Sequence, residues 1–166
     1  MTIGSHQSTI GKSQVHLTPK WMIDALGPFD TDPCAATMRP WDIGTACNWT
    51  AKDDGLAQVW KGFVWLNPPF HRYEVGRWID ALASHGHGIA LVHARTEAGW
   101  FEPIWRKADH LFFLADRIKF CRPDGTEQPA NSGAPVVLVG FGALAGERIA
   151  ASGIPGFSIK DWEIAA

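Results

Sequence analysis

Four consecutive residues, Asn67-Pro68-Pro69-Phe70, have the types and order needed to hold a flat amino group still while another group reacts with it. Proline lacks an N–H and fixes φ, so two in a row give a stiff backbone whose carbonyl oxygens point in set directions. The side-chain oxygen of Asn67 and the carbonyl oxygen of Pro68 can each accept one hydrogen of a single NH2 group. The Phe70 ring can stack on the ring that carries this group. The segment therefore favours chemistry on an exocyclic aromatic amine.

Such an amine is a poor nucleophile, because its lone pair is delocalised into the ring. Two acceptors that bind both N–H groups favour the tetrahedral nitrogen that attack requires, which is transition-state stabilisation by preorganised groups. Proximity to the electrophile that the amine attacks supplies the rest, and no covalent enzyme intermediate is needed. The alternative is a rigid strand-to-helix turn with Phe70 in the core.

Acidic side chains gather near two further predicted strand ends. Asp30 and Asp32 belong to a short predicted strand that starts at Phe29, and Asp53-Asp54 begins a turn. A cationic cofactor with ribose hydroxyls, such as S-adenosylmethionine, would suit these carboxylates. We expect Asp32 to face its methionine end or ribose, and Asp53 or Asp54 to accept a hydrogen bond from its adenine. Capping of turns or helices is the alternative role of these aspartates.

Other kinds of catalytic site have no pattern in the sequence. There is no glycine-rich phosphate loop, no metal-ligand spacing and no nucleophile beside a base. His71 and His93 are candidates for a general base, although a single histidine is more often an ordinary core or surface residue. The three cysteines form no pairing motif, so we expect no disulfide framework and no bound metal.

The elements that position these residues alternate between strands and helices. Strands are expected from Phe29 and over residues 46–50, 63–66, 89–92, 110–115, 117–121 and 135–141. Helices are expected over residues 19–26, with Thr18 as N-cap and Gly27 as C-cap, and over 56–60, 74–84 and 99–108. This order predicts an α/β fold with a mainly parallel sheet and an antiparallel C-terminal hairpin of residues 117–121 and 135–141. Ligands of such sheets bind at the carboxyl ends of the strands, where the polar residues above fall.

The composition favours one folded domain. The chain has 166 residues, of which 46% are hydrophobic and 19% charged, and no apolar run approaches the length of a membrane span. We expect a flexible N-terminus over residues 1–14, a catalytic domain over 15–142 and a tail over 143–166 with one helix, in a reducing cytoplasm. The net charge of −2 is not that of a protein that grips nucleic acid by charge alone. The arginines and lysines after residue 70 form either a local basic face or ordinary solvated surface.

Several short motifs, in this order and spacing, resemble the phage-type DNA N6-adenine methyltransferases, a small Dam-like family. The resemblance covers about residues 16 to 142, and we interpret it as family membership. The motifs are His16 to Pro19, Asp30 to Ala35, Asp53 to Leu56 with Trp60, Val64 to Phe70, Gly76 to Trp78, Ala94 to Thr96 with Trp100, and Arg117 to Phe120.

This resemblance implies a Rossmann-like fold that uses S-adenosylmethionine to methylate adenine in DNA, in a bacterial host cytoplasm and from a phage or prophage gene. The target adenine would be flipped out of the duplex, held by Asn67 to Phe70 and stacked on Phe70. The residues assigned to the methionine part of the cofactor are Thr18, Pro19, Asp30, Asp32 and Pro33, and those assigned to its adenine are Asp53 and Asp54. The candidate DNA contacts are His71, Arg72, Arg95, Thr96, Arg117 and Lys119. No separate recognition domain is visible, which predicts a short or loose recognition sequence.

Other substrates and another class of protein remain open at this stage. The motif also suits cytosine N4, adenine in RNA and glutamine in proteins, although glutamine enzymes usually carry Tyr where this chain has Phe70. A DNA-binding module that has lost catalysis is the main alternative from another class, and a structural virion protein is a distant third. A monomer and a dimer are both open at this stage.

Overall fold

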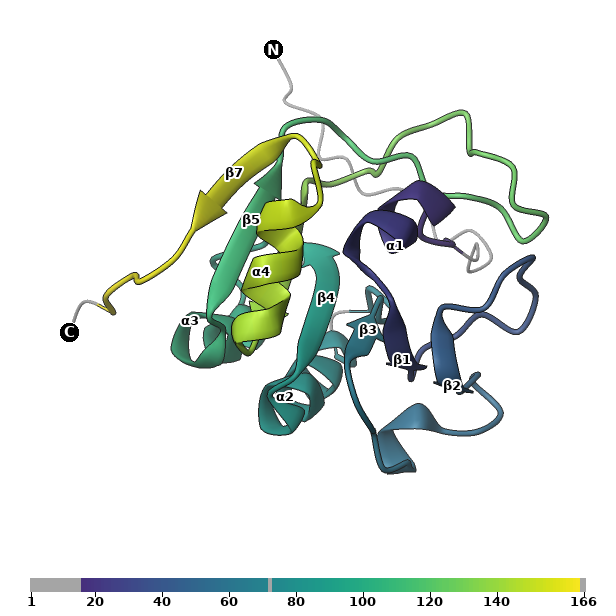
Figure 1. Ribbon diagram of the computed structural model, residues 1–166, viewed down its shortest axis with the longest axis horizontal. Helices are drawn as coiled ribbons and strands as arrows, with labels where there is room; N and C mark the ends of the chain where they lie inside the picture. The colour runs from purple at the N-terminus through teal and green to yellow at the C-terminus, as the bar shows by residue number, and fades with distance from the viewer. Residues whose placement is uncertain (1–15, 72, 165–166) are drawn as a thin grey trace, which may run out of the picture.

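One seven-stranded sheet forms the centre of the molecule (Figure 1). The computed structural model describes residues 16–71 and 73–164, so the predicted flexible segment 1–14 and Arg72 lie outside the described residues. The strands are β1 (Phe29–Asp32), β2 (Gly44–Asn48), β3 (Val64–Leu66), β4 (Gly88–His93), β5 (His110–Leu114), β6 (Val136–Phe141) and β7 (Gly156–Ile159). Their order across the sheet is β2-β1-β3-β4-β6-β5-β7. The predicted α/β class is confirmed.

The sheet is mixed. The pairs β1–β2, β1–β3 and β3–β4 are parallel, whereas β4–β6, β5–β6 and β5–β7 are antiparallel. The prediction of a mainly parallel sheet is therefore not confirmed, because only the half of the sheet that holds Asp32, Asn67 and His93 is parallel. In this half, β1, β3 and β4 are neighbours whose carboxyl ends lie along one edge.

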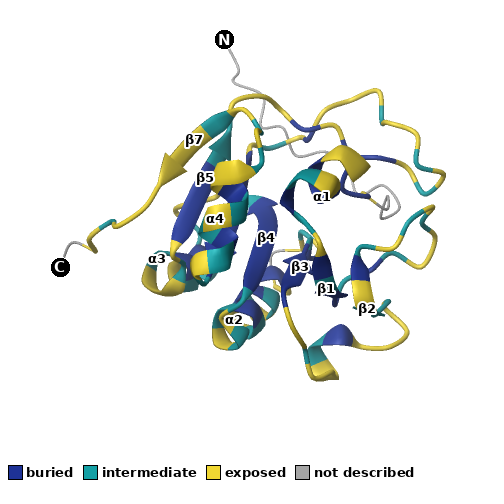
Figure 2. Cartoon of the chain, in the orientation of Figure 1, coloured by how far each residue is buried: buried dark blue, intermediate teal, exposed yellow. Residues whose placement is uncertain are grey.

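Helices cover both faces of the sheet. They are α1 (Lys20–Leu26), α2 (Val75–His85), α3 (Glu102–Lys107) and α4 (Ala143–Ala151), with 3-10 turns η1 (Gly55–Ala57) and η2 (Gly99–Phe101). Figure 1 shows α1 and α4 in front of the sheet and α2 and α3 behind it. Neighbouring strand residues such as Trp65 and Leu66 accordingly belong to opposite cores, as the alternation of a pleated strand requires. Figure 2 shows β1, β3, β4 and β5 as mostly buried and the edge strand β7 as mostly exposed.

The C-terminal residues extend this architecture. After residue 142, α4 buries Ala145 and Ile149 in the core that it shares with α1, and β7 pairs with β5 at the edge of the sheet. The helix expected in the tail is α4, whereas β7 was not expected. Residues 143–159 therefore pack with the same sheet as the residues before them. Among the described residues, no helix has the length and apolar character needed to cross a membrane.

The expected hairpin of residues 117–121 and 135–141 is wrong. Residues 117–120 form no strand, and Cys121 makes only isolated bridges, to Leu17 and Glu127. The alternation in this segment instead reflects packing on one side, because Ile118 and Phe120 are buried while Arg117 and Lys119 are exposed. The wholly buried β6 takes β4 and β5 as its partners.

Candidate active site

Three polar side chains that the sequence singled out lie where neighbouring strands end. Asp32 is the last residue of β1, Asn67 directly follows β3, and His93 ends β4. Since these three strands are adjacent and parallel, their carboxyl ends share one edge of the sheet. This edge is where open α/β sheets bind ligands.

The amide of Asn67 is fixed by the segment before α1. Its Nδ2 donates to the backbone carbonyl of His16 and to Thr18 Oγ1, each at 3.2 Å. A carbonyl oxygen can only accept, so the NH2 end of the amide must face His16. None of the side-chain hydrogen bonds among the described residues ends at Asn67 Oδ1. The orientation therefore leaves the oxygen available as an acceptor.

This contact corrects the role expected for Thr18 in the helix. α1 begins at Lys20, its N-cap is Pro19, and no side chain caps it. The buried Thr18 hydroxyl meets the Asn67 amide instead. Gly27 is the C-cap, as predicted. The segment just before α1 thus lies with Thr18 beside the end of β3.

The rest of the motif forms a turn with one aromatic wall. Pro68 is buried, Pro69 is exposed and Phe70 is half-buried. The Phe70 ring stacks on His93, with centroids 4.0 Å apart and planes 17° from parallel. Phe120 lies beside it at 6.2 Å and 59°. Phe70 thus packs against the core, as the structural alternative required, three residues after Asn67 in the same turn.

His93 is a neutral aromatic group in this wall. Burial, together with the nearby positive charges of Arg95 and His16, lowers the pKa of His93 to about 4. The imidazole is therefore uncharged at neutral pH, and such a weak base is poorly matched to general-base catalysis there. Its position suits stacking and hydrogen bonding.

Asp32 is a buried carboxyl group with spare hydrogen-bonding capacity. It is 4% exposed, and its Oδ1 accepts the backbone N–H of Cys34 at 3.0 Å. Burial raises its pKa to about 7, although the Cys34 N–H and the charge of Arg39 act in the opposite direction. No other described group donates to its side chain. Asp32 can thus take hydroxyl or ammonium donors from a ligand.

Asp30 has a different environment from Asp32. Its Oδ2 accepts the backbone N–H of Phe63 at 2.6 Å, just before β3 begins. The same stretch is tied by Thr31 Oγ1, which donates to the carbonyl of Lys61 at 2.8 Å. The structure therefore gives Asp30 a role in joining β1 to β3.

The Asp53-Asp54 turn lies beside the loop that follows Asp32. Asp53 accepts the backbone N–H and the hydroxyl of Thr50, both at 2.8 Å, and these bonds lower the pKa of Asp53. Gly55 is buried so close to this loop that a Cβ there would lie 2.0 Å from the Pro33 carbonyl oxygen. Asp53 and Asp54 are exposed at the rim, and Asp53 has the capping role that was the alternative.

The candidate DNA contacts divide into two groups. His71, Arg95 and Thr96 are exposed directly after β3 and β4, at the edge that carries Asn67. The cations of the segment after β5 have partners within the chain: Arg117 Nη1 donates to the Ser132 carbonyl at 3.0 Å, and Lys119 lies 3.4 Å from a carboxylate oxygen of Glu127.

Two residues of the site were not expected from the sequence. The His16 backbone carbonyl binds the Asn67 amide across 51 positions, and Phe120 borders the wall from a segment that was predicted to be a strand. Because every residue has a backbone carbonyl, the role of the His16 carbonyl cannot be recognised in the sequence. The alternating pattern of residues 117–121 predicts that Phe120 is buried, but it does not predict which residues Phe120 contacts.

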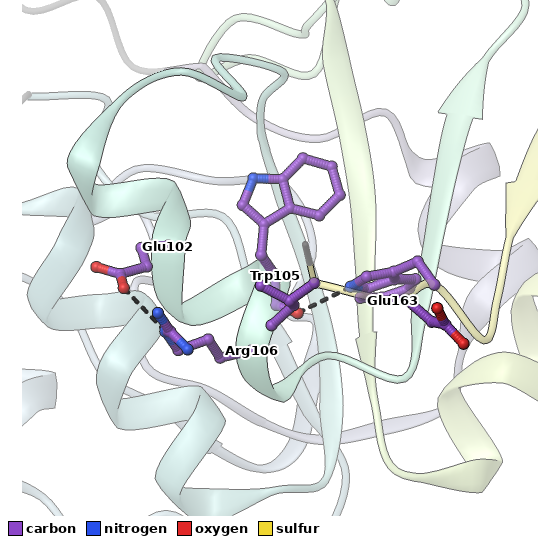
Figure 3. Close-up of a pocket in the computed structure, with 6 residues that line it drawn as sticks. Glu102, Trp105, Arg106 and Glu163 are labelled. Atoms are coloured by element: carbon purple, nitrogen blue, oxygen red, sulfur yellow. Dashed lines mark hydrogen bonds and ion pairs between the residues drawn. The ribbon is translucent and has the colours of Figure 1, made fainter. Parts of the chain in front are cut away.

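A separate cavity of about 320 Å³ lies between α3 and the C-terminal residues (Figure 3). Trp105 and Trp162 meet edge-on there, and Trp162 Nε1 donates to the Trp105 carbonyl at 2.8 Å. Arg106 is paired with Glu102 at its side. None of the residues that line this cavity belongs to the edge that holds Asp32, Asn67 and His93.

Comparison with known proteins identifies the family. The family model described as "DNA N-6-adenine-methyltransferase (Dam)" matches residues 8–154. Comparison with curated proteins and with solved structures gave no significant match. The family match spans all three strand ends described above.

Proposed function

The chain belongs to the DNA N-6-adenine-methyltransferase (Dam) family, and we propose that it transfers a methyl group from S-adenosylmethionine to N6 of adenine in DNA. In this proposal the target amine is held by Asn67 to Phe70. The fold would be the Rossmann-like fold of S-adenosylmethionine-dependent methyltransferases, and the target base would be flipped out of the duplex.

The orientation of the Asn67 amide carries this proposal. Because Nδ2 is bound to His16 and Thr18, Oδ1 is the atom that can accept from a substrate NH2 group. The Phe70–His93 stack, which begins three residues after Asn67 in the same turn, is an aromatic surface suited to a flat base. An amide acceptor next to an aromatic wall is what an exocyclic aromatic amine needs.

The buried Asp32 fits the proposed cofactor. Its carboxyl group has one hydrogen bond from the chain and lies in a setting where ionisation is costly, so a ligand that brings hydroxyl or ammonium donors would stabilise it. When bound, S-adenosylmethionine supplies an electrophilic methyl group on a sulfonium. The residues proposed to hold it are Asp32, the nearby Thr18, Pro19, Pro33, Asp53 and Asp54, and Asp30, whose carboxylate lies toward the amino end of β3. Among these, Asp30 has the least support, because the Phe63 N–H already binds its carboxylate.

The chain's own residues would then act on the target amine. Asn67 Oδ1 and the Pro68 carbonyl accept its two hydrogens and favour the tetrahedral nitrogen that reacts. Phe70 holds the ring in place, and the neutral His93 supports Phe70 from one side. Binding and orientation by these groups lower the barrier without a covalent enzyme intermediate.

Tritiated methyl transfer from S-adenosylmethionine to unmethylated DNA tests the proposal. We expect label in N6-methyladenine with the unmodified chain, and a loss of rate on the order of 10²–10³-fold in Asn67→Ala, the size found when one preorganised donor or acceptor is removed. Cofactor binding, measured separately by calorimetry, should be retained in the variant, which shows that the site is folded.

Label in cytosine, RNA or protein would replace the proposed substrate. No label on any of these substrates and no cofactor binding by the unmodified chain would refute methyl transfer altogether.

A further inference from the structure

We propose that residues 16–18 are a positioning element that presents Asn67 Oδ1 to the substrate amine, and that it requires an amide rather than a carboxylate at position 67. The inference rests on the proposed role of Asn67 as the acceptor of the target amine. It assigns Thr18, and the carbonyl of His16, to the orientation of that acceptor.

The chemistry of the two contacts fixes the direction of the amide. Both hydrogens of the Asn67 NH2 group have an acceptor at 3.2 Å, one on His16 and one on Thr18. A half-turn of the amide would break the bond to His16 and place Oδ1 against the His16 carbonyl oxygen, which has no hydrogen to offer, while the Thr18 hydroxyl could turn and donate to Oδ1. One orientation is therefore strongly favoured before any substrate arrives, which is what preorganised catalysis needs.

Residues 16–18 are themselves held in place by contacts with the segment around Phe120 and Cys121. Leu17 exchanges two backbone hydrogen bonds with Cys121, Leu17 N to Cys121 O at 3.0 Å and Cys121 N to Leu17 O at 2.8 Å. The His16 ring packs on Phe120, with centroids 5.5 Å apart, and its Nδ1 lies 3.1 Å from Gln128 Nε2. The segment is thus clamped between the strandless segment 117–121 and the end of β3.

Burial makes the Thr18 contact specific. Thr18 is 2% exposed, so water cannot readily replace its hydroxyl as the partner of the Asn67 amide. A valine of nearly the same shape would fill the space but leave one N–H of the amide unpaired. Serine would keep the acceptor and lose only a methyl group.

A carboxylate at position 67 would meet the wrong partner. Its second oxygen would face the His16 carbonyl, oxygen against oxygen, and only the Thr18 hydroxyl is able to turn and donate. Asn67→Asp therefore loses one attractive contact and gains a repulsive one, although it keeps an oxygen for the substrate.

Three variants and one control test this inference. We expect kcat of methyl transfer to fall about tenfold in Thr18→Val, to stay within about twofold in Thr18→Ser, and to fall further, about 10²-fold, in Asn67→Asp. The control is Thr45→Val, which makes the same change at an exposed position of β2 and should leave kcat unchanged.

A second measurement follows the amide directly, without cofactor or DNA. The Asn67 side-chain NH2 signals in a ¹⁵N correlation spectrum are identified by their absence in Asn67→Ala. Thr18→Ser and Thr45→Val should leave them in place, whereas Thr18→Val should move them and remove their contact to residue 18.

The outcomes separate this inference from the proposed function. A Thr18→Val variant with unchanged kcat and unchanged amide signals, or an Asn67→Asp variant as active as the unmodified chain, would overturn it. If Thr18→Val fails to fold, the inference is tested by the kcat of Asn67→Asp and by the Asn67 side-chain NH2 signals of Thr18→Ser. If the unmodified chain transfers no methyl group but its amide signals respond as expected, the proposed reaction fails and the positioning element stands.

Discussion

Asp32 has a buried carboxyl group whose ionisation the folded chain opposes. Its pKa is raised from 3.8 to about 7 by burial, a difference that corresponds to a stability loss on the order of 4 kcal/mol when the group is ionised. Between these two pH values the folded state holds a proton that the unfolded state has released. The stability therefore falls as pH rises from about 4 to about 7, and the full loss is present above pH 7.

Asp32→Asn should consequently make the free protein more stable. The amide keeps an oxygen for the Cys34 N–H but cannot ionise. We expect the free energy of unfolding at pH 8 to rise on the order of 1–3 kcal/mol, and the gain to shrink toward pH 4. Urea titrations at pH 5 and pH 8 measure this difference. Asp80→Asn, at an exposed position of α2, is the matched control and should change stability by less than about 0.5 kcal/mol at either pH.

Asp32→Asn should bind S-adenosylmethionine more weakly, because the hydroxyl or ammonium donors of the proposed ligand would no longer have a carboxylate as their acceptor. For the unmodified chain, affinity should rise between pH 6 and pH 8 as Asp32 ionises, and this rise should be absent in Asp32→Asn. The idea that Asp32 lowers stability but is needed for ligand binding would be contradicted by either of two results. One is an Asp32→Asn variant that is no more stable than the unmodified chain at pH 8, and the other is an Asp32→Asn variant that binds the cofactor equally well.

At the scale of elements, η1 is fitted against the loop that follows β1. Gly55 is where they touch: an added Cβ would lie 2.0 Å from the oxygen and 2.9 Å from the carbonyl carbon of Pro33. Backbone atoms cannot move aside as a flexible side chain can. The turn that carries Asp53 and Asp54 is therefore held at a fixed distance from the Asp32 loop by the absence of a side chain.

Gly55→Ala should push these two segments apart. We expect a loss of about 2 kcal/mol or more in the free energy of unfolding, together with weaker binding of S-adenosylmethionine, because both segments belong to the proposed cofactor site. Gly99→Ala is the matched control, since an added Cβ there meets nothing within 4 Å. Equal melting temperatures and equal cofactor affinities for the two variants would show that the contact does not position the site.

The elements that the sequence predicted best are those whose composition follows from burial. β4 and β6 are continuous apolar runs because both of their faces are covered, and α2 shows its buried stripe of Val75, Ile79 and Leu82. The same reasoning gave a wrong prediction for residues 117–121. An alternating pattern of apolar residues indicates that one side of a segment is buried, but it does not indicate whether another strand pairs with that segment.

The candidate site could be predicted only in part for a related reason. Asp32, Asn67 and His93 were found because the end of a strand is visible in the sequence. Their partners were not, because the Asn67–Thr18 contact joins residues 49 positions apart and Asp30 binds a backbone N–H 33 positions away. Such pairings are set by how the layers pack, and nothing in the local sequence encodes them.

At the scale of the whole molecule, the charge balance restricts how DNA is bound. The net charge is −2, so attraction to phosphates has to come from a local group of cations. Arg95 is exposed at the edge that carries Asn67, whereas Arg117 and Lys119 already have partners within the chain. DNA binding should therefore depend on few phosphate contacts and weaken only moderately with salt.

Arg95→Gln should remove one of these contacts. We expect weaker binding to all DNA sequences alike, and a slope of log affinity against log salt that is smaller by about 1, the value for one lost phosphate contact. Fluorescence anisotropy over a salt series measures both quantities. Lys61→Gln is the control: it removes one charge at an exposed position before β3, at the opposite end of the parallel strands, and should leave the slope unchanged.

If Lys61→Gln lowers the slope as much as Arg95→Gln does, DNA does not approach from the edge that holds Asn67, and a flipped base would have no path to the motif. A slope that only Arg95→Gln lowers would place the duplex at the carboxyl ends of β3 and β4, within reach of the amide that residues 16–18 orient.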